Sequence, residues 1–440
     1  MNSPAVFLRA VAAVCGMLVC HSLSGQMSGQ MSGQMSGRDL WSLERCISHA
    51  IQNNLQIKQQ ELAVKQAENY VLQSKLDFLP TFSATAQITG HPVNLISMNV
   101  VEGKALMVGA DAAVNASLPL FGGLSKINAF RSSRTQHLIS VQDIEKLCNG
   151  ISISITQAFL QVLLSIEIEA CADSSYNSVK EQACRVAKMV DAGSQAYSTL
   201  LEIEAQLANE KVQLVTARNN VRSNTLILVQ LLDLQSYENF EVEYPRTDLL
   251  HYDFETEGIN DIYRISMDLP QIKSAELALQ KSRYDYRAQK GLLFPSIFFS
   301  AGYGILGADR SPTVCLGINI PVFNGWKAHT SVRDARLDMQ NMELELRRSH
   351  QQLFKEITQA YNNARDSYEK CMAAGVNMEA AKESFSYIVK KFDAGMLNST
   401  DYIVAKANLF KSQSEYLQAK FQCVFHLKIL DFYKGIPIKL

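Results

Sequence analysis

Hydrophobic and polar positions along the chain follow two different periods, one typical of helices and one typical of strands. The helical segments lie in two long spans that contain no proline. Residues 126–190 and 326–392 contain no proline and are rich in Ala, Leu, Gln, Glu, Lys and Arg, which favour helix. Each span predicts one helix about 100 Å long, given a rise of roughly 1.5 Å per residue. Each is followed by an Asp-Ala-Gly triplet, whose glycine can take the left-handed conformation that ends a helix.

A second helix is predicted after each triplet, with apolar residues every seven positions. The first of these helices repeats at Leu200, Leu207, Leu214, Val221 and Leu228, with Ile203, Ala217 and Leu231 in the intermediate stripe. The second repeats at Tyr402, Leu409, Tyr416, Cys423 and Leu430. A seven-residue repeat of this kind is typical of a coiled-coil seam. The chain is therefore predicted to contain two long antiparallel helical hairpins with tips near 191–193 and 393–395.

Four shorter segments alternate between apolar and small or polar residues. The apolar rows are Phe82, Ala84, Ala86 and Ile88; Leu106, Val108, Ala110, Ala112, Val114, Ala116 and Leu118; Ile297, Phe299, Ala301, Tyr303 and Ile305; and Val314, Leu316, Ile318 and Ile320. A period of two predicts β-strands at about 81–90, 106–119, 295–306 and 313–322. Outer-membrane barrel strands have this pattern, and so does a half-buried sheet of a soluble protein.

Four strands cannot close a barrel, and an open edge in lipid leaves backbone groups without hydrogen bonds. If these strands meet lipid, several chains must share one barrel. A dimer would supply eight strands and a trimer twelve. Basic substitutions at Val108, Val114, Phe299 and Leu316 separate the two interpretations, because a lipid-facing row rejects Lys and Arg.

Similar strings recur at fixed distances, which indicates an internal repeat. "LPLFGG" at residues 118–123 recurs as "IPVFNG" at 320–325, and the Asp-Ala-Gly triplet recurs at the same offset of 202. Earlier in each copy the offset is 215, so the first copy carries thirteen extra residues, interpreted as a longer loop containing "HPVNLISMNVVEGK". At the two repeated strings we expect a strand to lead into a long helix, with proline ending the sheet pairing and glycine allowing the chain to turn. The residues of these strand-to-helix turns are Pro119, Phe121, Gly123, Pro321, Phe323 and Gly325.

The predicted organisation begins with a signal peptide at 1–25, whose apolar core is too short to span a bilayer. A low-complexity spacer follows at 26–39; its methionines are ligands for soft metals, but a plain linker is the favoured interpretation. The first repeat covers 40–234, an acidic joining segment 235–266, and the second repeat 267–440.

The composition and motifs give little indication of catalysis, metal binding or nucleic-acid binding. The formal charge is −1, which gives no indication of nucleic-acid binding, and none of the eight histidines lies at metal-ligand spacing from another. Seven cysteines follow residue 25 without a Cys-x-x-Cys pair, and no P-loop, dinucleotide loop or nucleophile elbow occurs. No enzyme, cofactor or metal site is therefore predicted.

From about Leu40 to Ile436 the chain resembles the TolC family of outer-membrane efflux proteins. The resemblance rests on the order and duplication of three features: the stretch from "SLERCISHAIQNNLQIKQQ" to "LDFLPTFSATA", the two Pro-x-Phe-x-Gly turns, and "KKFDAGMLNSTDYIVAKANLF". It implies a homotrimer with a twelve-stranded β-barrel in the outer membrane and a twelve-helix α-barrel in the periplasm. It also implies an exit duct without catalytic activity, engaged by a periplasmic adaptor and an inner-membrane transporter. The alternative is a soluble periplasmic coiled-coil adaptor or scaffold.

The resemblance also suggests functional residues at the periplasmic tip. Aligned from Gly395, the family's first acidic aperture position falls on Asp401, and Thr199 takes its place in the first copy. Asp401 also fits the first turn of a helix, where a negative charge suits the helix dipole. The tip turns, expected to contact the adaptor, are Asp191, Ala192, Gly193, Asp393, Ala394 and Gly395.

Overall fold

A computed structural model of the protein describes residues 39–95, 103–234, 240–244, 254, 258–306, 312–394 and 396–439. The predicted signal peptide lies outside the described residues, as does the predicted spacer up to residue 38. Gly395 of the second tip turn also lies outside them.

The long helices come in pairs of equal length. Helices α4 (Ser125–Asp191) and α8 (Lys327–Asp393) each have 67 residues. Helices α5 (Tyr197–Leu231) and α9 (Ser399–Tyr433) each have 35 residues, and α3 (Leu55–Leu76) and α7 (Pro270–Gly291) each have 22. Two short helices complete the set, α2 (Leu43–Asn53) and α6 (Ile259–Ser266). The long helices begin and end within one or two residues of the predicted positions.

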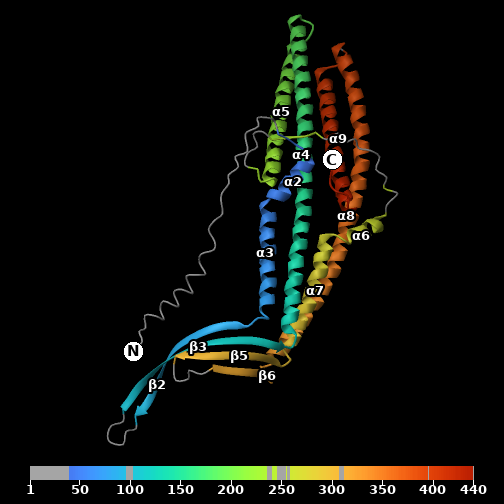
Figure 1. The fold of residues 1–440 in the computed structure, drawn as a ribbon. Coiled ribbons are helices and arrows are strands. Elements are labelled where there is room, and N and C mark those ends of the chain that lie inside the picture. Colours follow the sequence, from blue (N-terminus) through green and yellow to red (C-terminus); the bar gives the residue numbers. More distant parts are fainter. Residues whose placement is uncertain are drawn as a thin grey trace. The chain divides into compact units, whose positions relative to one another are not determined.

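The two predicted helical hairpins are confirmed. Helix α5 packs along α4 and α9 along α8, while α7 lies between α4 and α8, and α3 packs on α4 (Figure 1). The seven-residue seam faces inward, with Leu214, Leu228, Leu409 and Leu430 among its buried members. Two charged residues, Glu210 and Lys406, are also buried on these helices.

The four predicted strands form one antiparallel sheet in the order β2-β3-β5-β6. Its strands are β2 (Thr81–Leu95), β3 (Gly103–Gly122), β5 (Ser296–Leu306) and β6 (Pro312–Asn319). The expected longer loop in the first copy is largely wrong: much of the extra length extends the β2–β3 hairpin, with Leu95 paired to Gly103, and residues 96–102 lie outside the description. The additional backbone hydrogen bonds of a longer hairpin are satisfied between the two strands themselves.

The expectation that proline ends the sheet pairing holds in the second copy and is wrong in the first. Strand β6 ends at Asn319, before Pro321, but β3 continues through Pro119, which lies opposite Phe298, and reaches Gly122. The register shifts between Pro119 and Phe121. A bulge at this point accommodates a proline, because the extra residue relieves the ladder of one regular hydrogen bond.

A small two-stranded sheet was not foreseen. It pairs β1 (Asp39–Trp41) with β4 (Phe240–Val242), about two hundred residues apart in the chain. Trp41 and α2 cover the middle of α4, where Phe159 and Leu163 are buried in the same core. Among the described helices, α4 alone is long and apolar enough to cross a membrane by length and composition. A core helix passes the same test, and these contacts account for its apolar stretch.

Candidate functional site

The four apolar rows of the sequence meet on a single face of the sheet. Residues directly opposite each other on neighbouring strands project from the same face. Ala84 lies opposite Val114, which lies opposite Tyr303. Phe299 lies opposite Leu316. Because each row is continued by the next strand, the sheet has one continuous apolar face, and many of its large side chains are exposed.

The other face of the sheet carries small and polar residues. Ser83, Asn115, Ser300 and Cys315 alternate with the apolar rows. The two outer strands, β2 and β6, each have one edge without a neighbouring strand in the described chain. The sheet therefore has an apolar face that needs a non-aqueous surrounding and two edges that need further strands.

The first tip turn is built by a glycine in the left-handed conformation. Gly193 has φ 73°, and a Cβ at this position would meet no atom within 4 Å. The Ser194 N–H donates to the carbonyl of Met189 at 2.9 Å, which closes the end of α4. In the second copy the Met396 N–H donates in the same way to Lys391, also at 2.9 Å. Asp191, Ala192, Asp393 and Ala394 are all exposed at these turns.

Asp401 lies in the first turn of α9 and is exposed. Its backbone N–H donates to the Asn398 side chain at 2.8 Å, so Asn398 caps the helix. The carboxylate lines a groove of about 780 Å³ between α8 and α9, which also contains Lys391 and Lys411. Thr199 takes the matching place in the first turn of α5 and is half-buried.

The two strand-to-helix turns share one backbone geometry. Gly123 and Gly325 have φ of 60° and 65°, and each is followed by a large residue that is also left-handed. In the first turn a Cβ on Gly123 would come within 2.0 Å of the Gly291 carbonyl oxygen, so only glycine lets these two backbones meet. Phe121 and Phe323 are exposed beside the turns, and Pro321 lies in the segment between β6 and α8.

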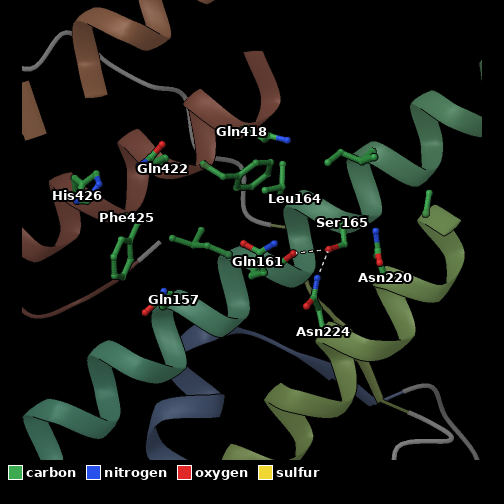
Figure 2. A pocket seen from close by; sticks show the side chains of 14 residues that line it. Gln157, Gln161, Leu164, Ser165, Asn220, Asn224, Gln418, Gln422, Phe425 and His426 are labelled. Atoms are coloured by element: carbon green, nitrogen blue, oxygen red, sulfur yellow. Dashed lines mark hydrogen bonds between the residues drawn. The ribbon is translucent and has the colours of Figure 1, made fainter. Parts of the chain in front are cut away.

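A groove of about 730 Å³ lies where the two hairpins meet. Figure 2 shows Gln157 and Gln161 of α4, Asn224 of α5 and Gln422 of α9 around it. Burial lowers the pKa of His426, which also lines the groove, so its imidazole is neutral at neutral pH. Amide groups both donate and accept hydrogen bonds, so this wall presents both kinds of group, and no Asp, Glu, Lys or Arg is among its lining residues.

Two buried charged residues, one on each hairpin, interact electrostatically nearer the tips. Glu210 of α5 is 4% exposed and Lys406 of α9 is 8% exposed. The Gln206 amide donates to one Glu210 oxygen at 2.8 Å, and the other oxygen, Oε2, is buried without a hydrogen-bond partner. Burial lowers the pKa of Lys406, and the nearby Glu210 carboxylate acts in the opposite direction.

Sequence analysis did not single out this pair, although a signal was present. Glu210 lies seven residues after Ile203 and seven before Ala217, in a stripe that continues with Asn224 and Leu231 and has Glu210 as its one charged member. A charged residue at such a position in a heptad seam is unusual and points to a specific partner. What the sequence does not give is the partner, because Lys406 lies in the other hairpin.

Within the described ranges, no three His, Cys, Asp or Glu side chains gather closely enough to hold a metal ion. The candidate functional features of the described chain are an apolar sheet face, two tip turns and a neutral groove.

The chain is similar to known proteins over most of its length. A sequence model of the family described as "Outer membrane efflux protein" matches residues 46–233 and 264–428. PrtF, a proteases secretion protein of Dickeya chrysanthemi, is 19% identical over 309 residues, which is 67% of this chain and 66% of PrtF. BepC, an outer membrane efflux protein of Brucella suis biovar 1, is 18% identical over 396 residues, which is 87% of this chain and 83% of BepC.

Among solved structures, the CmeC outer membrane channel of Campylobacter jejuni superposes with a TM-score of 0.76 at 18% identity. The match covers 89% of this chain and 85% of that chain. At this identity the likeness establishes the fold: duplicated helical hairpins attached to a four-stranded sheet.

Proposed function

This chain belongs to the outer membrane efflux protein family, and we propose that three copies of it form an outer-membrane exit duct for a tripartite efflux or secretion system. In this arrangement the sheets of three chains close a twelve-stranded barrel in the membrane, and the helices extend into the periplasm. A periplasmic adaptor and an inner-membrane transporter deliver the cargo. PrtF is named for protease secretion and BepC for efflux, and the proposal includes both kinds of export.

The observation that carries the proposal is the sheet with one apolar face and two unpaired edges. Lipid cannot hydrogen-bond a strand edge, so a sheet that faces lipid must close on itself. The four strands of one chain are too few, because a barrel whose interior is just filled by side chains already needs about eight. Closure therefore requires strands from other copies.

The internal repeat predicts how the copies meet. Within the described residues, α4 is flanked by α3 and α7, whereas α8 is flanked by α7, the repeat equivalent of α3, and has no helix in the place that α7 takes beside α4. The repeat equivalent of α4 is α8, 202 residues later, and the repeat equivalent of α7 is α3, 215 residues earlier. The equivalent of the α4–α7 contact is therefore a contact between α8 and the α3 of a neighbouring copy. Exposed apolar residues lie on both helices, including Leu62 and Tyr70 on α3 and Leu337 and Leu344 on α8.

The hydrogen bonds of the α4–α7 contact have chemically matched equivalents in the proposed α8–α3 contact between copies. Ser132 of α4 donates to Asp285 of α7; their repeat equivalents are Asp334 and Tyr70, again a carboxylate and a hydroxyl. Ser274 donates to Asp143 at 3.1 Å; the equivalents are Gln59 and Glu345, an amide and a carboxylate. Both transferred pairs can form a hydrogen bond, which supports this packing of one copy on the next.

The same repeat offsets predict how the sheet edges of neighbouring copies pair. Val114 lies opposite Tyr303 in the β3–β5 pair. The repeat then places Leu316 of β6 opposite Ile88 of β2 in the next copy, and Asn319 opposite Thr85. This register keeps Leu316 and Ile88 on the apolar face, so closure of the barrel leaves that face continuous.

The direct test combines native mass and cross-linking in detergent. Outer-membrane protein with Tyr70→Cys and Asp334→Cys, in a background where the exposed Cys184 and Cys315 are replaced by Ser, is expected to give a covalent species of three chains. Moving the second cysteine to Arg336, two residues along α8, should abolish the cross-link. A soluble species of one or two chains would overturn the duct and favour a periplasmic scaffold, whereas a ladder beyond three chains would overturn the closed ring.

At the tip, we infer that three Asp401 carboxylates form an aperture ring, with Thr199 at the matching place on the first hairpin. Close carboxylates repel one another and resist ionisation, and such a ring favours cations. Replacing Asp401 by Ala is expected to reduce the cation preference of single channels in planar bilayers. Glu415→Ala, on the same helix and farther from the tip, is the matched control; unchanged selectivity in Asp401→Ala would leave only the helix-capping role.

The tip turns are the proposed contact for the adaptor. A Gly193→Val change forces a β-branched residue into a left-handed backbone at a place where a side chain meets no other atom. The expected result is loss of export with trimers still present, scored by efflux from cells alongside the amount of trimer in the outer membrane. Equal loss of the trimer would show that the turn acts only in folding.

A further inference from the structure

The groove where the two hairpins meet is lined by side-chain amides from three helices. Six of them border it, two from each helix (Figure 2): Gln157 and Gln161 of α4, Asn220 and Asn224 of α5, and Gln418 and Gln422 of α9. The Asn224 amide donates to the Ser165 hydroxyl at 2.6 Å. The other amide side chains make no hydrogen bond within the part of the chain that the structure describes, so their donors and acceptors are free for a ligand.

This groove lies on the face of α4 that points away from α2 and the small sheet. Phe159 and Leu163 share a buried core with Leu43 of α2. Gln157 and Gln161 each lie two residues from Phe159, which places them about 200° round the helix from it. In the proposed duct, α2 and the small sheet must lie outside the ring of helices, because three copies of them inside would obstruct the passage. The amide groove therefore opens into the interior of the duct.

The lack of charge is specific to this groove. The second hairpin also has an exposed amide at the repeat-equivalent level, Asn363 of α8. However, Leu164 and Ile168, which line the groove, have Asp366 and Lys370 as their equivalents 202 residues later, and both of these are exposed. A charge-free wall is thus a property of the junction between the two hairpins of one chain rather than of every surface at this height.

The composition of the groove fits the chemistry of an uncharged sugar chain. A sugar hydroxyl both donates and accepts, as a side-chain amide does, so one can pair with the other in either direction. Leu160, Phe421 and Phe425 lie among the amides and match the apolar C–H faces of a pyranose ring. A charged ligand would lose water here without gaining an opposite charge. The volume of about 730 Å³ is within the range of ordinary small-molecule sites, about 300–1,000 Å³.

We propose that this groove binds uncharged oligosaccharides on the inner wall of the duct. Its lining residues all come from α4, α5 and α9 of one chain, so each copy holds a complete site. The inference rests on the proposed duct for where the groove faces, whereas the binding itself needs only the folded chain. Neutral glycans are then a class of cargo that the duct retains in transit longer than inert polymers of the same size.

The binding test uses the full chain in detergent and radiolabelled maltohexaose. The detergent is a polyoxyethylene ether, because the headgroup of a maltoside would compete for the groove. Equilibrium dialysis is expected to show saturable binding of one maltohexaose per chain. Gln161→Leu and Gln422→Leu should each weaken it roughly two- to tenfold, since each removes one hydrogen-bonding group while keeping the side chain's size. Asn363→Leu, at the repeat equivalent of Gln161, is the matched control and should leave the affinity unchanged.

Three results would overturn the site. The first is the absence of saturable binding, and the second is equal weakening by Asn363→Leu. The third is binding as tight by an uncharged peptide of alternating Ser and Gly residues, or by a galacturonate hexamer, because either would show that the groove does not select neutral sugars. Circular dichroism of each variant during denaturant unfolding separates a lost contact from a lost fold.

The location of the groove is tested by single-channel recording in planar bilayers. Maltohexaose added from the barrel side is expected to interrupt the current for longer than polyethylene glycol of equal mass, and Gln161→Leu should shorten these interruptions. Binding in dialysis without longer interruptions would place the groove off the passage and overturn its role in transport. Protein that stays soluble without detergent would overturn the duct, and the dialysis result would still decide whether the groove binds sugar.

Discussion

Replacing Leu316 by Arg is expected to remove the protein from the outer membrane. Leu316 lies in the middle of β6 on the apolar face and is 65% exposed in the single chain. A basic residue on the lipid face of a barrel costs about 2–4 kcal/mol near the bilayer midplane. Because the proposed trimer carries the substitution in every copy, the cost falls on each of its chains.

The neighbouring residue supplies the matched control. Cys315 projects from the opposite, polar face, so Cys315→Arg places the same charge one residue away and out of lipid. The amount of trimer in sucrose-gradient outer-membrane fractions is the measurement. Val108→Arg, Val114→Arg and Phe299→Arg should behave like Leu316→Arg, with smaller losses nearer the ends of the strands. Equal tolerance of Arg on both faces would mean that the sheet does not face lipid.

Replacing Glu210 by Gln is expected to lower the free energy of unfolding of the helical region by about 3 kcal/mol, because removal of one partner leaves a buried charge uncompensated. The charge left behind is that of Lys406, whose Nζ also lies 5.2 Å from the centre of the Phe385 ring. Denaturant unfolding of the detergent-solubilised protein, followed by circular dichroism, measures the change.

Two further variants distinguish the pair from a local packing effect. The double variant Glu210→Leu with Lys406→Met should recover most of the loss, because replacing a buried ion pair by apolar residues is often neutral or stabilising. Glu204→Gln, an exposed carboxylate on the same helix, should change the unfolding free energy by no more than about 0.5 kcal/mol. A double variant as unstable as Glu210→Gln would contradict the coupling of the two charges.

The burial of Lys406 also predicts that the stability of the helical region depends on pH. The folded-state pKa of Lys406 is lowered from the ordinary value of 10.5, mainly by burial. Between the lowered value and 10.5 the unfolded chain therefore binds more protons at this residue than the folded chain. The contribution of Lys406 to stability rises with pH across that interval. Lys406→Met should remove this rise.

Much of the fold was determined by local sequence. The absence of proline over about sixty-five residues, with a glycine at the end, set the lengths of α4 and α8 to within two residues. The alternation along β2, β3, β5 and β6 identified the apolar face, because successive side chains of a strand point to opposite sides whatever the strand pairs with. These features depend on backbone geometry that acts over a few residues, and the sequence therefore encodes them directly.

Other features were decided by the tertiary structure. Pro119 stays inside β3 because β5 pairs with it through a bulge, and β1 finds β4 about two hundred residues away. Glu210 looks like an isolated charge in a seam, and Lys406 lies outside the seven-residue row of its own helix, until the two hairpins bring the two residues near each other. No residue preference predicts the left-handed backbone of Leu124 and Trp326. Each of these depends on which distant segments share a buried surface, and that choice is made by the packing of the whole chain rather than by any local pattern.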